Sequence, residues 1–106
     1  MSEIVLYSDS VEYLYASITA FEVDGTAVDP TSYTAEVAIV EPDVAVEEAD
    51  WADAAWVKVG TTDRVRVLTG DQALPLVAGH YSVYVRLTGN VETIIRQAGR
   101  LTVRDL

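Results

Sequence analysis

Apolar and polar residues alternate one by one along most of this chain, and this period of two constrains the fold more than any other feature. Over residues 12–23, for example, Leu14 and Ala16 fall on one side of an extended chain, and Tyr13 and Tyr15 fall on the other. Successive side chains of a β-strand point to opposite faces, so the alternation predicts strands with one buried face. The same pattern predicts strands over residues 4–7, 33–40, 56–59, 64–68, 81–88, 91–97 and 100–104.

Turn residues separate these runs. Asp24-Gly25 and Gly89-Asn90 are strong turn signals, because glycine adopts a positive φ at no steric cost and Gly-Asn favours a tight hairpin. Residues 60–63 form a further turn signal, and Gly99 predicts a β-bulge within the last strand run. Short strands with turn signals at this spacing favour a sandwich over a barrel or an α/β fold.

One local segment refines the fold prediction. The segment Leu74–Tyr81 resembles the corner that leads into the penultimate strand of many immunoglobulin-like and fibronectin-like domains, where a tyrosine hydroxyl hydrogen-bonds to nearby backbone. We therefore expect an all-β, immunoglobulin-like β-sandwich of about seven or eight antiparallel strands. With 106 residues, the chain is expected to form one such domain over residues 1–106.

Two segments depart from the simple alternation. We interpret residues 1–10 as an N-terminal arm or edge strand, with Ile4, Val5, Leu6 and Tyr7 as its extended part. Residues 41–55 are acidic and alanine-rich, and we expect them to form a long acidic loop that connects the two sheets, with a short helical turn between Val46 and Ala55.

The net charge of −10 is unevenly distributed along the sequence. Residues 1–57 carry a charge of −13 without any Lys or Arg, and residues 58–106 carry +3. Because nucleic-acid phosphates require a basic surface, we expect no nucleic-acid partner. Two interpretations of the asymmetry stay open. The opposite charges pair inside the fold, or an acidic face and an arginine-bearing face lie on opposite sides of the molecule and support docking.

Residue types that carry catalysis are sparse. His80 is the only histidine, and we interpret it as an exposed residue where a strand begins rather than as a base. The absence of cysteine excludes disulfides and thiolate metal sites. The acidic residues of 41–53 lack the spacing and the glycine of a calcium-binding loop. We expect no enzymatic activity and no cofactor.

Membrane and export signals are also missing from the sequence. No apolar run approaches the roughly 20 residues that span a bilayer. The residues Met1-Ser2-Glu3-Ile4 do not resemble the start of a signal peptide, so we expect synthesis in the cytoplasm and no membrane partner.

Aromatic residues outside the predicted core are the best candidates for binding a partner. Such side chains are favoured at protein interfaces and at sugar-binding surfaces. Together with the N-terminal segment, the candidate partner-binding residues are Ile4, Val5, Leu6, Tyr7, Tyr13, Tyr15, Trp51, Trp56 and Tyr84.

Three stretches together resemble a known family. They are Val23–Thr31 with the pattern DG-x-x-V-D-P-T, the segment from Ala49-Asp50-Trp51 to Trp56-Val57, and the pair Ala78–Arg86 and Ala98–Val103 with the pattern A-G-x-Y-x-V-x-V-R and A-G-x-L-T-V. They are similar to the short immunoglobulin-like virion proteins of tailed phages that infect actinobacteria. The resemblance covers most of the chain from Val23 onward and implies fold and context, but it assigns no functional residue.

The resemblance implies a structural role in a tailed-phage virion. We expect a capsid-surface decoration or minor capsid protein that binds the major capsid protein, other virion subunits or further copies of itself. Two alternatives stay open, namely a tail or baseplate module that binds carbohydrate and a head–tail connector or tail element.

Overall fold

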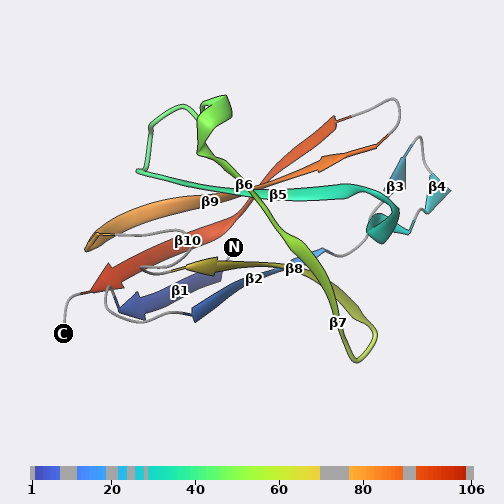
Figure 1. Ribbon diagram of the computed structural model, residues 1–106, viewed down its shortest axis with the longest axis horizontal. Coiled ribbons are helices and arrows are strands. Elements are labelled where there is room, and N and C mark those ends of the chain that lie inside the picture. Colours follow the sequence, from blue (N-terminus) through green and yellow to red (C-terminus); the bar gives the residue numbers. More distant parts are fainter. Residues whose placement is uncertain are drawn as a thin grey trace.

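The computed structural model shows an all-β chain (Figure 1). The structure describes residues 2–7, 12–18, 22–23, 26–27, 29–69, 77–89 and 93–104. Two sheets contain most of these residues, in an arrangement compatible with a β-sandwich. Among the described residues, no helix is long and apolar enough to cross a membrane.

The larger sheet has five strands in the order β1-β10-β9-β5-β6, and the smaller has three in the order β2-β8-β7. A two-residue pair, β3-β4, stands apart from both sheets. The bounds are β1 Ser2–Tyr7, β2 Glu12–Ile18, β3 Glu22–Val23, β4 Thr26–Ala27, β5 Thr34–Val40, β6 Trp51–Asp53, β7 Ala55–Val59, β8 Thr62–Thr69, β9 Gly79–Thr88 and β10 Thr93–Arg104, with two 3₁₀ turns, η1 Pro30–Ser32 and η2 Glu48–Asp50.

The strand prediction was correct for the main strands and incomplete for the short ones. The additional strands are β4 and β6, which have only two and three residues and therefore show no alternation, and the end of the predicted run over residues 12–23 is the separate strand β3. The prediction of antiparallel pairing throughout was wrong for β1, which pairs with β10 in parallel, from Ser2 opposite Gly99 to Tyr7 opposite Arg104. Parallel neighbours require a long connection, and these two strands stand at opposite ends of the described chain.

The hydrophobic core lies between the two sheets and follows the predicted alternation. Leu14 of β2 and Val65 of β8 are buried on one side, and Val37 of β5, Val83 of β9 and Leu101 of β10 are buried on the other. Each such side chain contributes about 1.5–3 kcal/mol when it is removed from water. The inward residues form one cluster with Tyr33, Ala35, Val67, Val85, Leu87 and Val103.

Two predicted local features lie along β9 and β10. These strands pair antiparallel from Thr88 opposite Thr93, so they form a hairpin around residues 89–92. The turn residue Asn90 is outside the described residues. The register shifts between Gln97 and Gly99, which confirms a bulge at the position that the glycine indicated.

The Asp29-Pro30-Thr31 sequence forms a capped turn. Asp29 Oδ1 accepts hydrogen bonds from the Thr31 amide at 3.0 Å and from its hydroxyl at 2.7 Å. The Thr31 side-chain bond and then the backbone bond hold the pKa of Asp29 below its ordinary range. Pro30 is buried at the first position of η1, where its missing N–H is not needed. The turn signal at Asp24-Gly25 is outside the described residues.

The chain crosses from one sheet to the other around Ala54. Its amide donates to Ala35 O at 3.0 Å, between β6 in the five-stranded sheet and β7 in the three-stranded sheet. Residues 41–55 do connect the two sheets, and η2 supplies the expected turn. They are not a loop throughout, because Trp51–Asp53 pairs with β5 as a short edge strand and Ala55 begins β7.

Tyr81 makes the corner bond that the sequence predicts. Its hydroxyl donates to Val77 O at 2.7 Å, across the point where the chain enters β9. Its ring packs against the core, and burial is the main cause that raises the pKa of the hydroxyl. Leu74, the other corner residue, is outside the described residues.

Replacing Tyr81 with phenylalanine removes this hydrogen bond and keeps the ring. We expect the free energy of unfolding to fall by about 1 kcal/mol, the usual net value of one such bond. Urea denaturation measures the change. Tyr84→Phe is the control, because the Tyr84 hydroxyl has no hydrogen-bond partner among the described residues, and an equal loss in both variants would contradict the assigned role.

Candidate interaction surface

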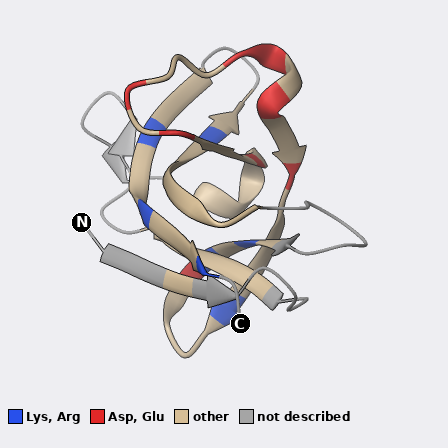
Figure 2. Cartoon of the chain, turned by 90° about the vertical axis from the view of Figure 1, so that its left-hand side faces the viewer, with Lys and Arg blue, Asp and Glu red and all other residues tan. Residues whose placement is uncertain are grey.

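Part of the outer face of the five-stranded sheet is covered by the chain's own acidic segment, residues 41–50. Ala38 and Val40 alternate away from the core, yet both are buried. Figure 2 shows acidic residues gathered on this segment, which folds back above the sheet. In η2, the Glu47 amide donates to Asp50 Oδ2 at 2.8 Å, which fixes the turn locally. The molecule itself therefore covers the β5 part of this face, whereas the outward residues Val5 of β1 and Ile95 of β10 are 46% and 52% exposed.

Arg86 connects the acidic segment to the sheet. Its Nε and Nη2 donate to the two oxygens of Glu36, each at 2.9 Å, and its Nη1 and Nη2 donate to Glu48 at 3.0 and 2.8 Å. The guanidinium also lies 4.6 Å from the centre of the Trp51 ring. Glu36 is opposite Arg86 in the β5–β9 register, and Glu48 belongs to η2. One cation thus ties β9, β5, β6 and the acidic segment together.

These contacts change how the cluster titrates. Hydrogen bonds from Arg86 hold the pKa of Glu48 below its ordinary range. The hydrogen bonds to Glu48, followed by those to Glu36, raise the pKa of Arg86 further above neutrality. The Arg86 and Glu36 side chains are only 16% and 19% exposed, so water screens this pair incompletely. In this cluster, opposite charges from the acidic and the basic parts of the sequence therefore pair inside the fold, as the first interpretation of the charge asymmetry predicts.

The outer face of the three-stranded sheet is uncovered by any described segment. Tyr13 is 45% exposed, Tyr15 is 39% exposed, and Val59 at the far strand is 46% exposed. The Arg66 guanidinium lies 4.3 Å from the centre of the Tyr13 ring, and the Tyr13 and Tyr15 rings are 6.2 Å apart. We call this surface the tyrosine–arginine face and define it by Tyr13, Tyr15, Val59 and Arg66.

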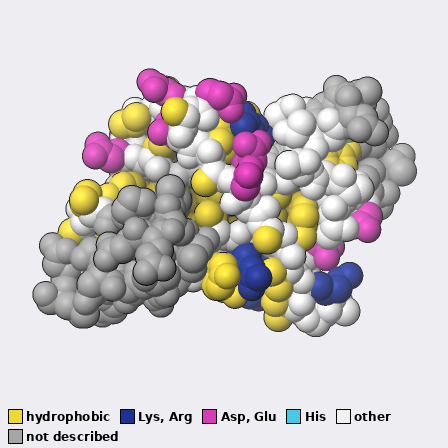
Figure 3. Space-filling model, viewed as in Figure 1, with side chains coloured by type: hydrophobic (Ala, Val, Ile, Leu, Met, Phe, Trp, Pro, Cys, Tyr) yellow, Lys and Arg dark blue, Asp and Glu magenta, His cyan; other side chains and the backbone are white. Residues whose placement is uncertain are grey.

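No acidic residue stands at the outward positions of β2, β7 and β8. Those positions hold tyrosines, small and aliphatic residues, Thr62, and the two arginines Arg64 and Arg66. Asp63 alternates to the other side and pairs with Lys58 at 3.7 Å. Figure 3 shows magenta acidic side chains gathered over the segment that follows β5, and dark blue beside yellow near β7 and β8. The charge asymmetry of the sequence is therefore also partly an asymmetry of faces.

The structure separates the sequence-predicted binding residues into distinct places. Tyr13 and Tyr15 lie together on the tyrosine–arginine face. Trp51 lies under Arg86, and Trp56 packs against the core with its Nε1 donating to Tyr33 O at 2.8 Å. Both tryptophans are thereby occupied by intramolecular contacts. Tyr84 lies on the outer side of β9, in the other sheet from Tyr13 and Tyr15.

The N-terminal candidates Ile4, Val5, Leu6 and Tyr7 lie in β1, paired with β10 of the same chain. Val5 is 46% exposed. Strand β1 is therefore an edge strand of the domain's own sheet. Among the described residues, no strand pairs with the edge of β1 that faces away from β10, and this edge is the one available to a neighbouring molecule. Arg66 and Arg86 were not predicted from the sequence, because their partners are remote in sequence and become neighbours only when the strand register is known.

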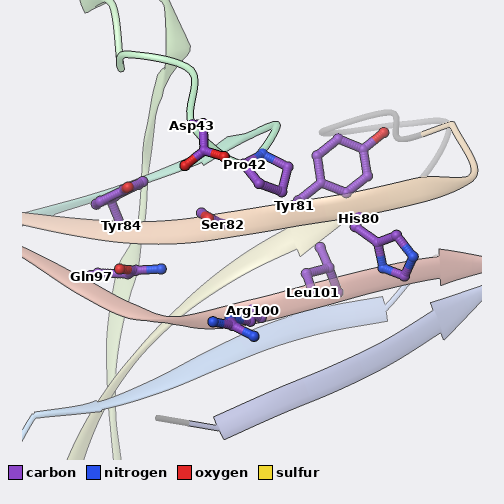
Figure 4. Close-up of a pocket in the computed structure, with 9 residues that line it drawn as sticks. All are labelled: Pro42, Asp43, His80, Tyr81, Ser82, Tyr84, Gln97, Arg100 and Leu101. Atoms are coloured by element: carbon purple, nitrogen blue, oxygen red, sulfur yellow. The ribbon is translucent and has the colours of Figure 1, made fainter.

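A groove of about 580 Å³ lies on the five-stranded sheet, between Pro42 and Asp43 on one side and strands β9 and β10 on the other. Figure 4 shows Pro42 and Asp43 above it, His80, Ser82 and Tyr84 along β9, and Gln97 and Arg100 from β10 below. His80 is exposed, and its Nδ1 lies 3.2 Å from Thr102 Oγ1. No group of three or more His, Cys, Asp or Glu side chains that could hold a metal ion exists among the residues described.

Comparisons with protein-family models, with curated proteins and with solved structures find no match for this chain. The resemblance to phage virion proteins therefore stays a prediction from the sequence motifs.

Replacing Arg86 with methionine keeps an apolar stem over Trp51 and removes the guanidinium. We expect the pKa of Glu48 to rise towards its ordinary value, as measured by carboxyl-carbon NMR titration. At neutral pH the free energy of unfolding should fall by about 1–3 kcal/mol, because Glu36 is left half-buried without its partner. A carboxyl group whose pKa is lowered by folding stabilises the fold at pH values above its unfolded-state pKa, and this stabilisation is lost as the pH falls. The difference in free energy of unfolding between wild type and Arg86→Met should therefore narrow below about pH 4.

Arg104→Met is the matched control for this variant, since Arg104 is also on a strand of the same sheet and is exposed. An unchanged Glu48 titration in Arg86→Met, or an equal loss of stability in Arg104→Met, would contradict the role assigned to the cluster.

Proposed function

We propose that this chain is a non-enzymatic structural protein with an immunoglobulin-like fold, and that it binds other protein subunits on the surface of a tailed-phage capsid. The observation that carries the proposal is the contrast between its two outer faces. One face is covered by the chain's own acidic segment over β5 and β9 and exposes Val5 and Ile95 near its β1 edge, whereas the other presents Tyr13 and Tyr15 beside Arg66, together with Val59.

The immunoglobulin-like assignment is supported by the order of the strands. The strands β10, β9 and β5 are arranged as G, F and C are in immunoglobulin domains, with β6 added beside them as C′ is in variable-type domains. The strands β2, β8 and β7 follow the order B, E and D. The Tyr81 hydroxyl bond to Val77 O also resembles the tyrosine corner of such domains.

The tyrosine–arginine face has the composition of a protein interface. Tyrosine and arginine are enriched among the residues that dominate binding energy at interfaces. Tyrosine buries a large area at low entropy cost, and arginine supplies several hydrogen-bond donors and a planar group that stacks on aromatic rings. Arg66 is already held against the Tyr13 ring, so less freedom is lost when a partner binds. The two outward arginines favour an acidic patch on the partner. Repetition of a capsid lattice would add avidity to each modest contact.

The capsid setting comes from the sequence resemblance, and immunogold electron microscopy of particles from the source phage tests it. With antibody raised against this chain, we expect label over the head. Label at the tail tip would favour the tail or baseplate alternative, and particles from which the chain is absent by mass spectrometry would overturn the virion proposal.

The contact face is tested by charge reversal. We expect Arg66→Glu to weaken binding of the purified chain to particles that lack it by roughly tenfold or more, because like charges across an interface cost several kcal/mol. Cosedimentation measures the binding. Arg104→Glu makes the same charge change at an exposed position on β10 and should bind like wild type. Equal weakening by both variants would show a general charge effect and contradict the assigned face.

One observation favours the carbohydrate-binding alternative, and it is the groove beside Tyr84. An aromatic ring flanked by Gln97, Arg100 and Asp43 combines a stacking surface with hydrogen-bonding groups that suit sugar hydroxyls. Glycan-array binding that is lost in Tyr84→Ala and retained in Tyr13→Ala would promote this alternative over the capsid proposal.

A further inference from the structure

The strand β2 occupies an edge of the three-stranded sheet. Its seven residues, Glu12–Ile18, pair with β8 on one side, and no described strand pairs with its other side. In constant-type immunoglobulin domains a first strand pairs at the corresponding edge. Here the first strand, β1, pairs with β10 in the other sheet instead. The outer edge of β2 therefore presents backbone donors and acceptors that no described strand uses.

Edge strands are usually protected against pairing with another chain, and β2 lacks these protections. Typical devices are short length, proline, a bulge or a lysine in the strand. The edge strand β6 has only three residues, and β7 has five and carries Lys58. The edge strand β1 also lacks proline, glycine and basic residues, but it has six residues and belongs to the other sheet. The strand β2 is longer, pairs with β8 without a register shift, and contains no proline, glycine or basic residue. This absence of protection favours a strand that is paired when the protein works.

The sequence of β2 is compatible with pairing to its own copy. In an antiparallel pair centred on Tyr15, all seven residues find a partner, and Tyr15 is opposite the same residue of the second chain. Glu12 is then opposite Ile18, so no like charges meet, and Tyr13 is opposite Ser17. Directly opposite residues share a face, so Leu14 and Ala16 stay on the core side and the tyrosines stay outside.

We propose that two copies of this chain associate through β2 in antiparallel register about Tyr15, which joins their three-stranded sheets into one six-stranded sheet. The tyrosine–arginine faces of the two copies then lie side by side on the same surface. This inference follows from the strand order and from the β2 sequence, and it does not depend on the proposed role in a virion. A symmetric pair of this kind is closed, because the same strand is used by both copies.

Single cysteines test the register, since the chain contains no natural cysteine. In Tyr15→Cys the two thiols are directly opposite, with Cα atoms about 4.5–5.5 Å apart, within the range of a disulfide. In Tyr13→Cys the two copies of the cysteine are four positions apart, about 13 Å along the strand, and out of reach. Val59→Cys places an exposed thiol on β7 of the same sheet face as a control for random collision.

We expect mild oxidation to convert Tyr15→Cys into a covalent dimer and to leave Tyr13→Cys and Val59→Cys as monomers. Light scattering should give wild type a mass of twice the 11.5 kDa of one chain at high concentration. Cross-linking of all three variants alike, or wild type that is monomeric at every concentration while Tyr15→Cys remains unlinked, would overturn the proposal. A monomeric wild type with unlinked Tyr15→Cys is the result expected if β2 pairs only with a strand of another protein.

A charge variant tests the interface without breaking the fold. Tyr15→Glu places two carboxylates opposite each other between the copies, and within each chain it faces Arg66, its partner in the β2–β8 register. We expect the association constant to fall by roughly tenfold or more. Val59→Glu adds the same charge to β7 and should dimerise like wild type. If Tyr15→Glu dimerises as strongly as wild type, the dimer proposal is overturned. If Tyr15→Glu no longer binds particles, that result by itself bears on the proposed function and not on the dimer.

Discussion

The ion pairs of Arg86 are the interaction on which the arrangement of this molecule most depends. Six carboxylates stand between residues 41 and 53 with no basic residue among them, so this segment repels itself and would favour water over the sheet. Arg86 is fixed on a central strand and donates to Glu36 and Glu48 at the same time. By anchoring η2, it keeps residues 41–50 close to the sheet, where Ala38 and Val40 are buried. The Trp51 ring beneath the guanidinium adds a contact that lysine would not supply equally.

Covering part of one face makes the outer surfaces of the two sheets different. Among the described residues, acidic side chains gather over the segment that follows β5, as Figure 3 shows. The other sheet presents tyrosines and arginines at its outward positions. The two interpretations of the charge distribution are thus not exclusive, because Arg86 neutralises part of the acidic half internally while Arg64 and Arg66 remain on the opposite sheet.

The sequence predicted those features that depend on local alternation and failed for those that depend on register. The inward positions of β2, β5, β8, β9 and β10 were correct, because one buried face imposes a period of two on each strand. The Tyr81 corner was also predictable, since its bond spans only four residues. In contrast, Glu36 and Arg86 are 50 residues apart, and only the β5–β9 pairing shows that they are opposite.

The failures at the candidate site have the same origin. Trp51 appeared to belong to a loop because a three-residue strand has too few residues to show alternation, and its contact with Arg86 requires the β5–β6 pairing. The pairing of β1 with β10 joins the two ends of the described chain, and no local signal reports it. Tyr13 and Tyr15 were identified correctly as outward aromatics, yet the sequence did not indicate that Arg66 packs on the Tyr13 ring.

Net charge also limits which surfaces of two copies can approach each other. At −10, two molecules repel at a distance, so stable contact requires surfaces from which acidic residues are absent or where they are paired. The acidic segment fails this condition, because Glu41, Asp43 and Glu47 are exposed and no described ion pair involves them. The outward positions of the three-stranded sheet meet it, as does the β2 edge, whose single carboxylate stands at one end of the strand. Among the described residues, the charge distribution therefore directs association towards the outward positions of the three-stranded sheet, which hold no carboxylate.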